Sequence, residues 1–117
     1  MPPSTACCGH RRALVWWVEL DPSVGSEVHK TCPAVIVSND SANRNLARVV
    51  VVPLTSNTQR LYPGEAVVMV DGQRSKAMAD QIMAADKTRL KGQLGAVGKA
   101  EMQAVEDAIR VHLALAK

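Results

Sequence analysis

Short runs of apolar, mostly β-branched residues, separated by turn-forming residues, make up most of the chain before position 98. Runs of this length, closed by Pro, Gly, Asn or Asp, are typical of buried strands rather than helices. Because Pro33 cannot donate a ladder hydrogen bond, we expect it to open its strand, with Lys30 and Thr31 at that strand's polar mouth. The four clearest strands are expected at 13–20, 34–37, 48–55 and 65–70.

The second half of the chain alternates weaker strand patterns with turns. Asp71-Gly72 is a strong hairpin signal, and residues 77–83, ambiguous by propensity, are interpreted as the returning strand. Residues 87–90 are expected to form a turn and 93–97 a short last strand. From Lys99 onward, apolar residues recur every three or four positions, which predicts an amphipathic helix with one face formed by Met102, Val105, Ile109, Leu113 and Ala116.

This order of elements predicts a mainly β fold, a small, open, largely antiparallel barrel with peripheral helices. Residues 1–10 are expected to be a flexible tail and residues 11–117 a single domain. Residues 21–29 lack any apolar period and are expected to form a loop between two strands. Residues 41–46 fit a short helical turn capped by Asp40, but an ordinary connecting turn is favoured.

Composition and charge exclude only a few classes of protein. The net charge of +3 and the pI near 9.0 fit a polyanion-binding protein, although many unrelated domains share them. Cys7, Cys8 and Cys32 are odd in number and two are adjacent, which favours a reducing compartment over a disulfide framework. No CxxC pair or second His at ligand spacing supports a zinc site. With no apolar run of membrane-spanning or signal-peptide type, we expect a cytoplasmic protein with no membrane partner.

Two adjacent tryptophans lie in the first strand. Alternation along a strand places Trp16 and Trp17 on opposite faces. One is expected to enter the core, and the other to lie at a dimer face, in a ligand groove or under a loop. Packing in the core and under a loop is the favoured interpretation.

Polar residues follow or precede three of the predicted strands and could converge at one rim. Thr55 lies where the valine-rich strand leaves the core, and a strand-end hydroxyl by itself is more often satisfied by the backbone. A rim of lysines, hydroxyls and amides suits a phosphate backbone better than an apolar small molecule. The residues concerned are Lys30, Thr31, Thr55, Ser56, Asn57, Ser75, Lys76, Asp80 and Gln81.

Several segments, in order and spacing, closely resemble the MazF/PemK toxins of bacterial toxin–antitoxin modules. The resemblance runs from about Arg12 through the C-terminal helix and is far more specific than one short motif. Its clearest segments are Val15-Trp16-Trp17-Val18-Glu19-Leu20-Asp21-Pro22, Gly25-Ser26-Glu27, Pro33-Ala34-Val35-Ile36-Val37-Ser38-Asn39-Asp40, Val52-Pro53-Leu54-Thr55-Ser56 and Ala79-Asp80-Gln81-Ile82.

The resemblance implies an SH3-like barrel that forms a homodimer and cleaves single-stranded RNA without a metal or other cofactor. It also implies a cognate antitoxin, whose disordered tail occupies the RNA groove, and cleavage by attack of the ribose 2′-OH on the adjacent phosphorus. By position, Thr55 matches the family's catalytic threonine. With this match, a functional role for the Thr55 hydroxyl is favoured over a hydroxyl that is merely satisfied by the backbone. Residues that match or adjoin RNA-holding positions are Asn39, Ser75 and Gln81, together with His29 and Ser56.

Cys32 departs from the family, which places its principal catalytic arginine immediately before this proline. A thiol supplies neither a permanent charge nor the forked donors of a guanidinium group. Three interpretations stay open: Lys30, His29 or Arg12 supplies the charge, the enzyme is slow and selective, or only binding is kept. Compensation is favoured, so Lys30 and Cys32 join Thr55 as predicted catalytic residues.

Two other functions compete with a ribonuclease toxin. One is a non-enzymatic poison of a protein target, as CcdB-like relatives of the same barrel are for DNA gyrase. The other is a weakened or inactive homologue that competes for the antitoxin. The threonine and glutamine at positions 55 and 81 favour RNA as the target.

Overall fold

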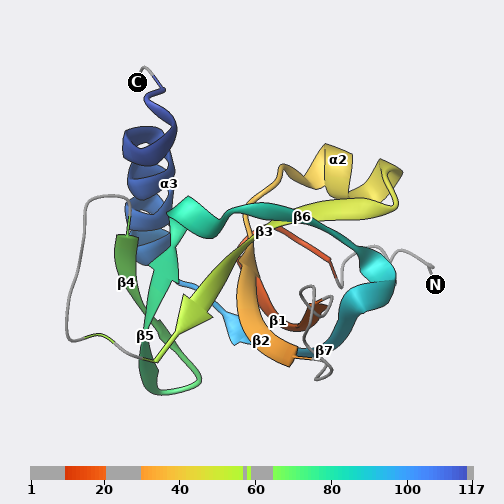
Figure 1. Cartoon of the computed structure of the whole chain (residues 1–117), viewed down its shortest axis with the longest axis horizontal. Coiled ribbons are helices and arrows are strands. Elements are labelled where there is room, and N and C mark those ends of the chain that lie inside the picture. Colours follow the sequence, from red (N-terminus) through yellow and green to blue (C-terminus); the bar gives the residue numbers. More distant parts are fainter. Residues whose placement is uncertain (1–9, 21–29, 57, 59–64, 116–117) are drawn as a thin grey trace, which may run out of the picture.

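An antiparallel sheet of seven strands, with one long helix beside it, forms the part of the chain that the computed structural model describes, which is residues 10–20, 30–56, 58 and 65–115 (Figure 1). Strands follow one another in space as β4-β5-β3-β2-β1-β7, and β6 pairs with β3 outside this path. The mainly β, open-barrel class expected from the sequence is confirmed. The elements are β1 (Leu14–Leu20), β2 (Lys30–Ile36), α2 (Asp40–Asn45), β3 (Arg48–Thr55), β4 (Glu65–Val70), β5 (Gln73–Met78), η1 (Ala79–Gln81), β6 (Met83–Asp86), η2 (Lys87–Arg89), β7 (Leu90–Ala96) and α3 (Lys99–Leu113).

The two faces of the sheet bury two separate apolar cores. Because side chains alternate along a strand, β3 sends Val52 and Leu54 into the core beneath α3, and Val49 and Val51 into the core enclosed by the barrel. Trp16 packs against the enclosed core. Trp17, on the opposite face, is 38% exposed. Its predicted packing under a loop stays a prediction, because the expected loop at 21–29 lies outside the described residues.

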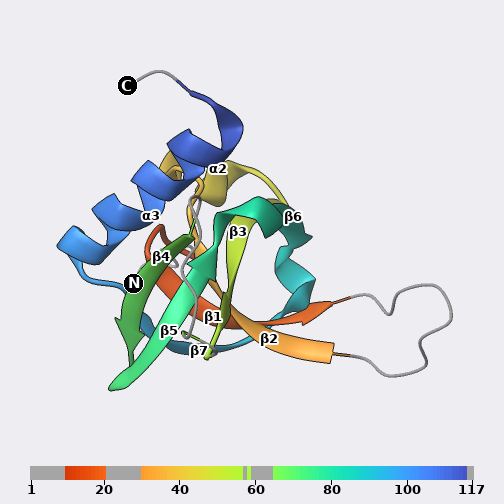
Figure 2. The ribbon, with the colours of Figure 1, turned by 60° about the vertical axis from the view of Figure 1, so that its left-hand side comes forward.

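Helix α3 packs against β4 and the turn η1 (Figure 2). Its first turn is fixed by Glu101, whose carboxylate accepts the Gly98 N–H at 3.2 Å and the Met69 N–H of β4 at 2.7 Å. The predicted apolar face is confirmed at Met102 and Val105, which are buried. Leu113 at the end of the helix is 46% exposed, so the buried face stops before that residue.

Pro33 lies inside β2, so the prediction that it opens this strand is wrong. On one edge β2 pairs with β1 from Lys30 onward, but on the other edge β3 reaches only from Ala34 to Ile36. Pro33 therefore sits where β2 has an edge without a partner strand, a place where a missing N–H is tolerated.

Residues 77–83 are not one strand, which contradicts the prediction. Strands β5 and β6 pair with the same edge of β3, and the turn η1 separates them. Leu54 faces Ala77 and Val51 faces Met83, so β3 advances three residues while its partner advances six. The three surplus residues leave the ladder as Ala79–Gln81, in the manner of a bulge that re-aims side chains.

A short helix, α2, replaces the connecting turn that was favoured after β2. The Asn39 side chain accepts the Ala42 N–H at 2.8 Å, so Asn39 rather than Asp40 caps this helix.

The hairpin at Asp71-Gly72 is confirmed, and both residues have positive φ, as in a type I′ turn. The turn expected at 87–90 is the 3-10 turn η2, and the last strand, β7, is longer than predicted. Residues 1–9 of the expected tail and the expected loop at 21–29 lie outside the described residues.

Candidate functional site

Two hollows meet at Thr55. The first, of about 380 Å³, is lined by Trp17, Pro33, Leu54, Thr55, Ser56, Val70, Asp71, Gln73, Ser75 and Leu94. The second, of about 320 Å³, is lined by Cys32, Pro53, Leu54, Thr55, Met78, Gln81 and Met83. The structure thus brings together five of the predicted site residues: Cys32, Thr55, Ser56, Ser75 and Gln81.

Strand pairing explains why Thr55 is at the centre. Thr55 is the last residue of β3 and faces Lys76 of β5. On the other side, the pairing of β2 with β3 ends where Ala34 faces Pro53, two residues before Cys32 and Thr55. Cys32 and Thr55 lie just beyond this last pair and line the second hollow together.

Gln81 reaches the second hollow because it belongs to the turn that leaves the ladder. Its Nε2 lies 3.7 Å from the Met78 sulfur, and both residues line the hollow. In an uninterrupted strand, the alternation of side chains between the two faces of the sheet would fix the direction of the Gln81 side chain. The surplus residues between β5 and β6 therefore place an amide near the threonine.

A buried ion pair lies on the strand next to Thr55. The Lys76 ammonium is 3.3 Å from a carboxylate oxygen of Glu65, and the two side chains are only 9% and 11% exposed. The residue that faces Thr55 in β5 is therefore a lysine paired with a carboxylate of β4.

Three predicted residues remain: Lys30, His29 and Asn39. Lys30 is the first residue of β2 and its backbone faces Leu20, but its side chain lies outside the description, as does His29 altogether. Asn39 lies beyond the opposite end of β2, where its side chain caps α2. Asn39 lines neither hollow.

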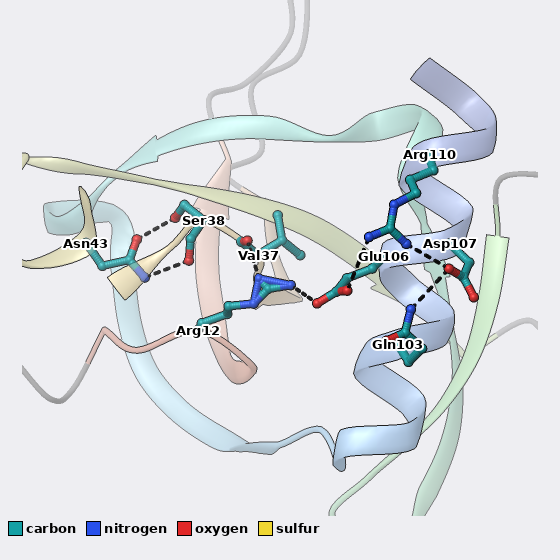
Figure 3. A network of polar contacts seen from close by, with 8 residues as sticks. All are labelled: Arg12, Val37, Ser38, Asn43, Gln103, Glu106, Asp107 and Arg110. Carbon is teal, nitrogen blue, oxygen red and sulfur yellow. Dashed lines mark hydrogen bonds and ion pairs between the residues drawn. The ribbon is translucent and has the colours of Figure 1, made fainter. Parts of the chain in front are cut away.

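Arg12, one of the three cations considered for compensation, is engaged elsewhere (Figure 3). Its Nη1 donates to the Val37 carbonyl at 3.1 Å, and its Nη2 pairs with the Glu106 carboxylate of α3. Glu106 also lies 3.9 Å from Arg110, whose Nη1 donates to Asp107 at 2.9 Å. Arg12 therefore joins the start of β1 to α3, and it lines neither hollow at Thr55.

Polar side chains around Arg12 bond to one another as well. The Ser38 hydroxyl bonds the Asn43 side chain, whose Nδ2 donates to the Ser38 carbonyl at 2.9 Å (Figure 3). The Asp40 carboxylate accepts the Arg12 backbone N–H at 2.8 Å. This hydrogen bond is the main reason that the pKa of Asp40 lies below its ordinary value of 3.8, with Asn43 and nearby arginines adding to it.

Among the residues that line the first hollow, the polar Asp71 and Gln73 and the aromatic Trp17 were not assigned to the site from the sequence. The alternation in β1 offered Trp17 a groove as one of its places, and that is where its ring lies. Asp71 and Gln73 belong to the β4–β5 hairpin turn and the strand after it, and their part in the hollow depends on how the hairpin folds over β3.

The chemistry available at Thr55 is that of hydroxyls, amides, a thiol, an aromatic ring and the Asp71 carboxylate. Such groups donate to phosphate oxygens and stack on bases. Among the described residues, no cluster of three His, Cys, Asp or Glu side chains could hold a metal ion. Neither α2 nor α3 has the length and apolar content that a membrane-spanning helix needs.

Known proteins resemble this chain in sequence and in fold. Residues 11–113 match the family described as the PemK-like, MazF-like toxin of type II toxin–antitoxin systems. Endoribonuclease MazF9 of Mycobacterium tuberculosis is 38% identical, over 90% of this chain and 97% of that protein. Endoribonuclease EndoA of Bacillus subtilis is 30% identical, over 90% and 95%.

A solved structure of a mycobacterial endoribonuclease in complex with its cognate antitoxin superimposes with a TM-score of 0.73 at 32% identity. The match covers 92% of this chain and 97% of that one. The family resemblance inferred from the segments around Pro33, Thr55 and Gln81 is thereby confirmed. This chain belongs to the family of PemK-like, MazF-like toxins of type II toxin–antitoxin systems.

Proposed function

We propose that this protein is the toxin of a toxin–antitoxin module and acts as a metal-independent endoribonuclease on single-stranded RNA in the cytoplasm. It works as a homodimer and is silenced by a cognate antitoxin. The observation that supports this most is the meeting of two hollows at Thr55, whose lining includes the Thr55 and Ser75 hydroxyls and the Gln81 amide that the family resemblance selects. Its relatives of 30% identity and above bear the name endoribonuclease.

The reaction needs groups that move a proton and stabilise a phosphorane. The ribose 2′-oxygen forms a bond to the adjacent phosphorus, the bond from phosphorus to the 5′-oxygen breaks, and a 2′,3′-cyclic phosphate remains. The 2′-OH gives its proton to a base, and the leaving 5′-oxygen takes one from an acid. We assign to the Thr55 hydroxyl the donation of a hydrogen bond to a phosphorane oxygen, where charge develops in the transition state.

The other lining residues hold the strand on either side of the scissile phosphate. Gln81 and Ser75 supply an amide and a hydroxyl, and Ser56 adds a second hydroxyl next to Thr55. Trp17 offers an exposed ring on which a base can stack, as single-stranded RNA readers commonly use. Asn39, which matches an RNA-holding position of the family, and His29, predicted from the sequence to bind RNA, stay in the proposal, although Asn39 lines neither hollow and His29 lies outside the described residues.

Positive charge at the phosphate is the function that Cys32 cannot perform. Since Arg12 is committed to Glu106 and Val37, Lys30 and His29 remain of the three original candidates. We favour Lys30, which lies two residues from Cys32 in β2. The expected result for Lys30→Ala is loss of cleavage by a folded protein, and unchanged cleavage would exclude this role.

The experiment that tests the function is incubation of the purified protein with a long single-stranded RNA in EDTA. Discrete fragments ending in a cyclic phosphate are expected, and intact RNA would overturn the proposal in favour of an inactive homologue or a poison of a protein target. Cys32→Arg in the same assay is expected to raise the rate by about tenfold or more, since one transition-state donor is worth about a hundredfold. No gain would mean that the site is built around the thiol.

A further inference from the structure

A third hollow continues the line that begins at Thr55. It has a volume of about 320 Å³ and is lined by Val18, Glu19, Arg48, Met83, Ala84, Ala85, Asp86 and Arg89. It shares Met83 with the second hollow, which in turn shares Leu54 and Thr55 with the first. The three hollows therefore follow one another across the molecule, with the proposed cleavage site in the middle of the series.

Cations from three elements gather at this third hollow. Arg48 begins β3 and Arg89 ends η2, and both line the hollow. Lys87 adjoins them, because its N–H donates to the Ala47 carbonyl at 3.0 Å, and Lys91 lies 3.7 Å from the Glu19 carboxylate. We name Arg48, Lys87, Arg89 and Lys91 the basic strip.

The charge balance of this surface is positive. Four cations of the basic strip face two carboxylates, Glu19 and Asp86, which leaves two of the three net charges of the whole chain in this one place. Nearby His10 adds little, because burial and the charge of Lys87 hold its pKa below its ordinary value of 6.5. The local positive charge therefore comes from the lysines and arginines of the basic strip.

The four cations differ in how far they are committed to the fold. Arg89 donates from Nη1 to the Glu19 carbonyl at 3.4 Å, and Lys91 pairs with the Glu19 carboxylate. Arg48 is exposed and makes no ion pair or side-chain hydrogen bond with any residue that the structure describes. Arg48 faces Asp86 in the pairing of β3 with β6 without an ion pair between them, and a guanidinium at the edge of a hollow is suited to a phosphate.

We propose that the basic strip binds the backbone phosphates of the RNA segment that flanks the cleavage site, so that the third hollow holds a nucleotide beyond those at Thr55. The proposal rests on the proposed function, since the ligand is the same RNA strand. An RNA strand seated at Thr55 has to leave along the surface, and the third hollow is the continuation that carries cations. Phosphate contacts of this kind add affinity and fix register without reading sequence.

The test compares Arg48→Ala with Arg110→Ala, which removes the same charge from α3 on the other side of the molecule (Figure 1). Affinity is measured for an RNA of about a dozen nucleotides with a 2′-deoxy group at the cut site, and for a trinucleotide that covers only the cut site. For the long RNA, Arg48→Ala is expected to weaken binding about threefold to tenfold and to lower the salt slope by about 0.7. Trinucleotide binding and the Arg110→Ala variant should stay at wild-type values, and Arg48→Lys should restore most of the loss.

Equal losses for the long RNA and the trinucleotide, or no loss for either, would overturn the proposal. So would a loss confined to binding of a polyglutamate peptide, because the strip would then serve an acidic protein segment. Failure of the proposed function is seen separately, since the 2′-deoxy RNA reports binding without cleavage. If wild-type protein binds the long RNA through Arg48 but never cuts RNA, the basic strip stands and the nuclease falls.

Discussion

The two ends of β2 are both rich in polar residues, but they use them differently. Past Ile36, the polar groups bond to one another: Arg12 to Val37 and Glu106, Ser38 to Asn43, and Asn39 to the first turn of α2. At the other end, Cys32 and the neighbouring Thr55 line hollows that open to solvent. The first end holds elements together, and the second offers chemistry to a ligand.

This difference shows why polar residue type alone is a poor guide to function. Arg12 and Asn39 are the residues that a search for RNA contacts would choose, yet their donors and acceptors join β1, α2 and α3. A side chain whose hydrogen bonds are already made within the fold has little left for a substrate. If the comparison holds, substitutions at one end of β2 should change stability and those at the other end should change cleavage.

The largest effect is expected at Thr55. Thr55→Val keeps the β-branched shape that suits the end of β3 and removes the hydroxyl that is proposed to face the phosphorane. Cleavage should fall about a hundredfold or more, which corresponds to roughly 2.7 kcal/mol of transition-state stabilisation. Initial rates on a single-stranded RNA in EDTA measure this, with Thr55→Ser as the variant that keeps the hydroxyl. Wild-type rates for Thr55→Val would remove Thr55 from the proposed mechanism.

A smaller effect, and of the opposite kind, is expected at Arg12. Arg12→Met keeps much of the side chain's length but leaves the Val37 carbonyl and Glu106 without its guanidinium, a loss of about 1–2 kcal/mol in the free energy of unfolding. Well below the melting temperature, cleavage should stay at the wild-type rate. Urea unfolding followed by circular dichroism measures the change in the free energy of unfolding. The more exposed Arg110→Met is the control, for which we expect a loss of about 0.5 kcal/mol or less.

Loss of cleavage in a folded Arg12→Met protein would break the comparison. It would return Arg12 to the cations that replace the family arginine at Cys32. Stability equal to that of the wild type would show that the network in Figure 3 does not hold β1 to α3.

Sequence patterns predicted the strands with strong apolar runs because burial on both faces leaves a clear signature, as in the valines of β3. They failed at Ala79–Gln81. These residues leave the sheet because the segment from β5 to β6 is three residues longer than the stretch of β3 that it pairs with, and a local sequence pattern holds no information about that pairing. Resemblance to the family selected Thr55 and Gln81 by position. It could not separate Asn39 from them, since whether an amide caps a helix or lines a hollow depends on the helix that forms after it.

Asn39 offers a finer test, because two substitutions separate its cap from its amide. Asn39→Ala removes both and should cost about 1 kcal/mol of unfolding free energy, whereas Asn39→Ser keeps a capping oxygen and should cost a few tenths. Both variants should cleave RNA at rates close to wild type if the side chain is only structural. A rise in KM for Asn39→Ser without loss of stability would instead support the RNA contact that the alignment assigns.

The smallest effect concerns the pH dependence of stability through Asp40. The Arg12 N–H bond, helped by Asn43 and nearby arginines, holds the pKa of Asp40 below 3.8, so the folded protein prefers the ionised carboxylate. A lowered pKa in the folded state stabilises the protein above the unfolded pKa, and this contribution is lost as the pH falls through the folded value. Asp40→Asn should therefore be less stable than wild type near neutral pH, and the difference should shrink below pH 3.8. Because Asp40 is exposed, the difference should be modest and should weaken in high salt. Thermal melts of both proteins over this pH range measure it, and parallel curves would show that the carboxylate does not help to hold Arg12 against α2.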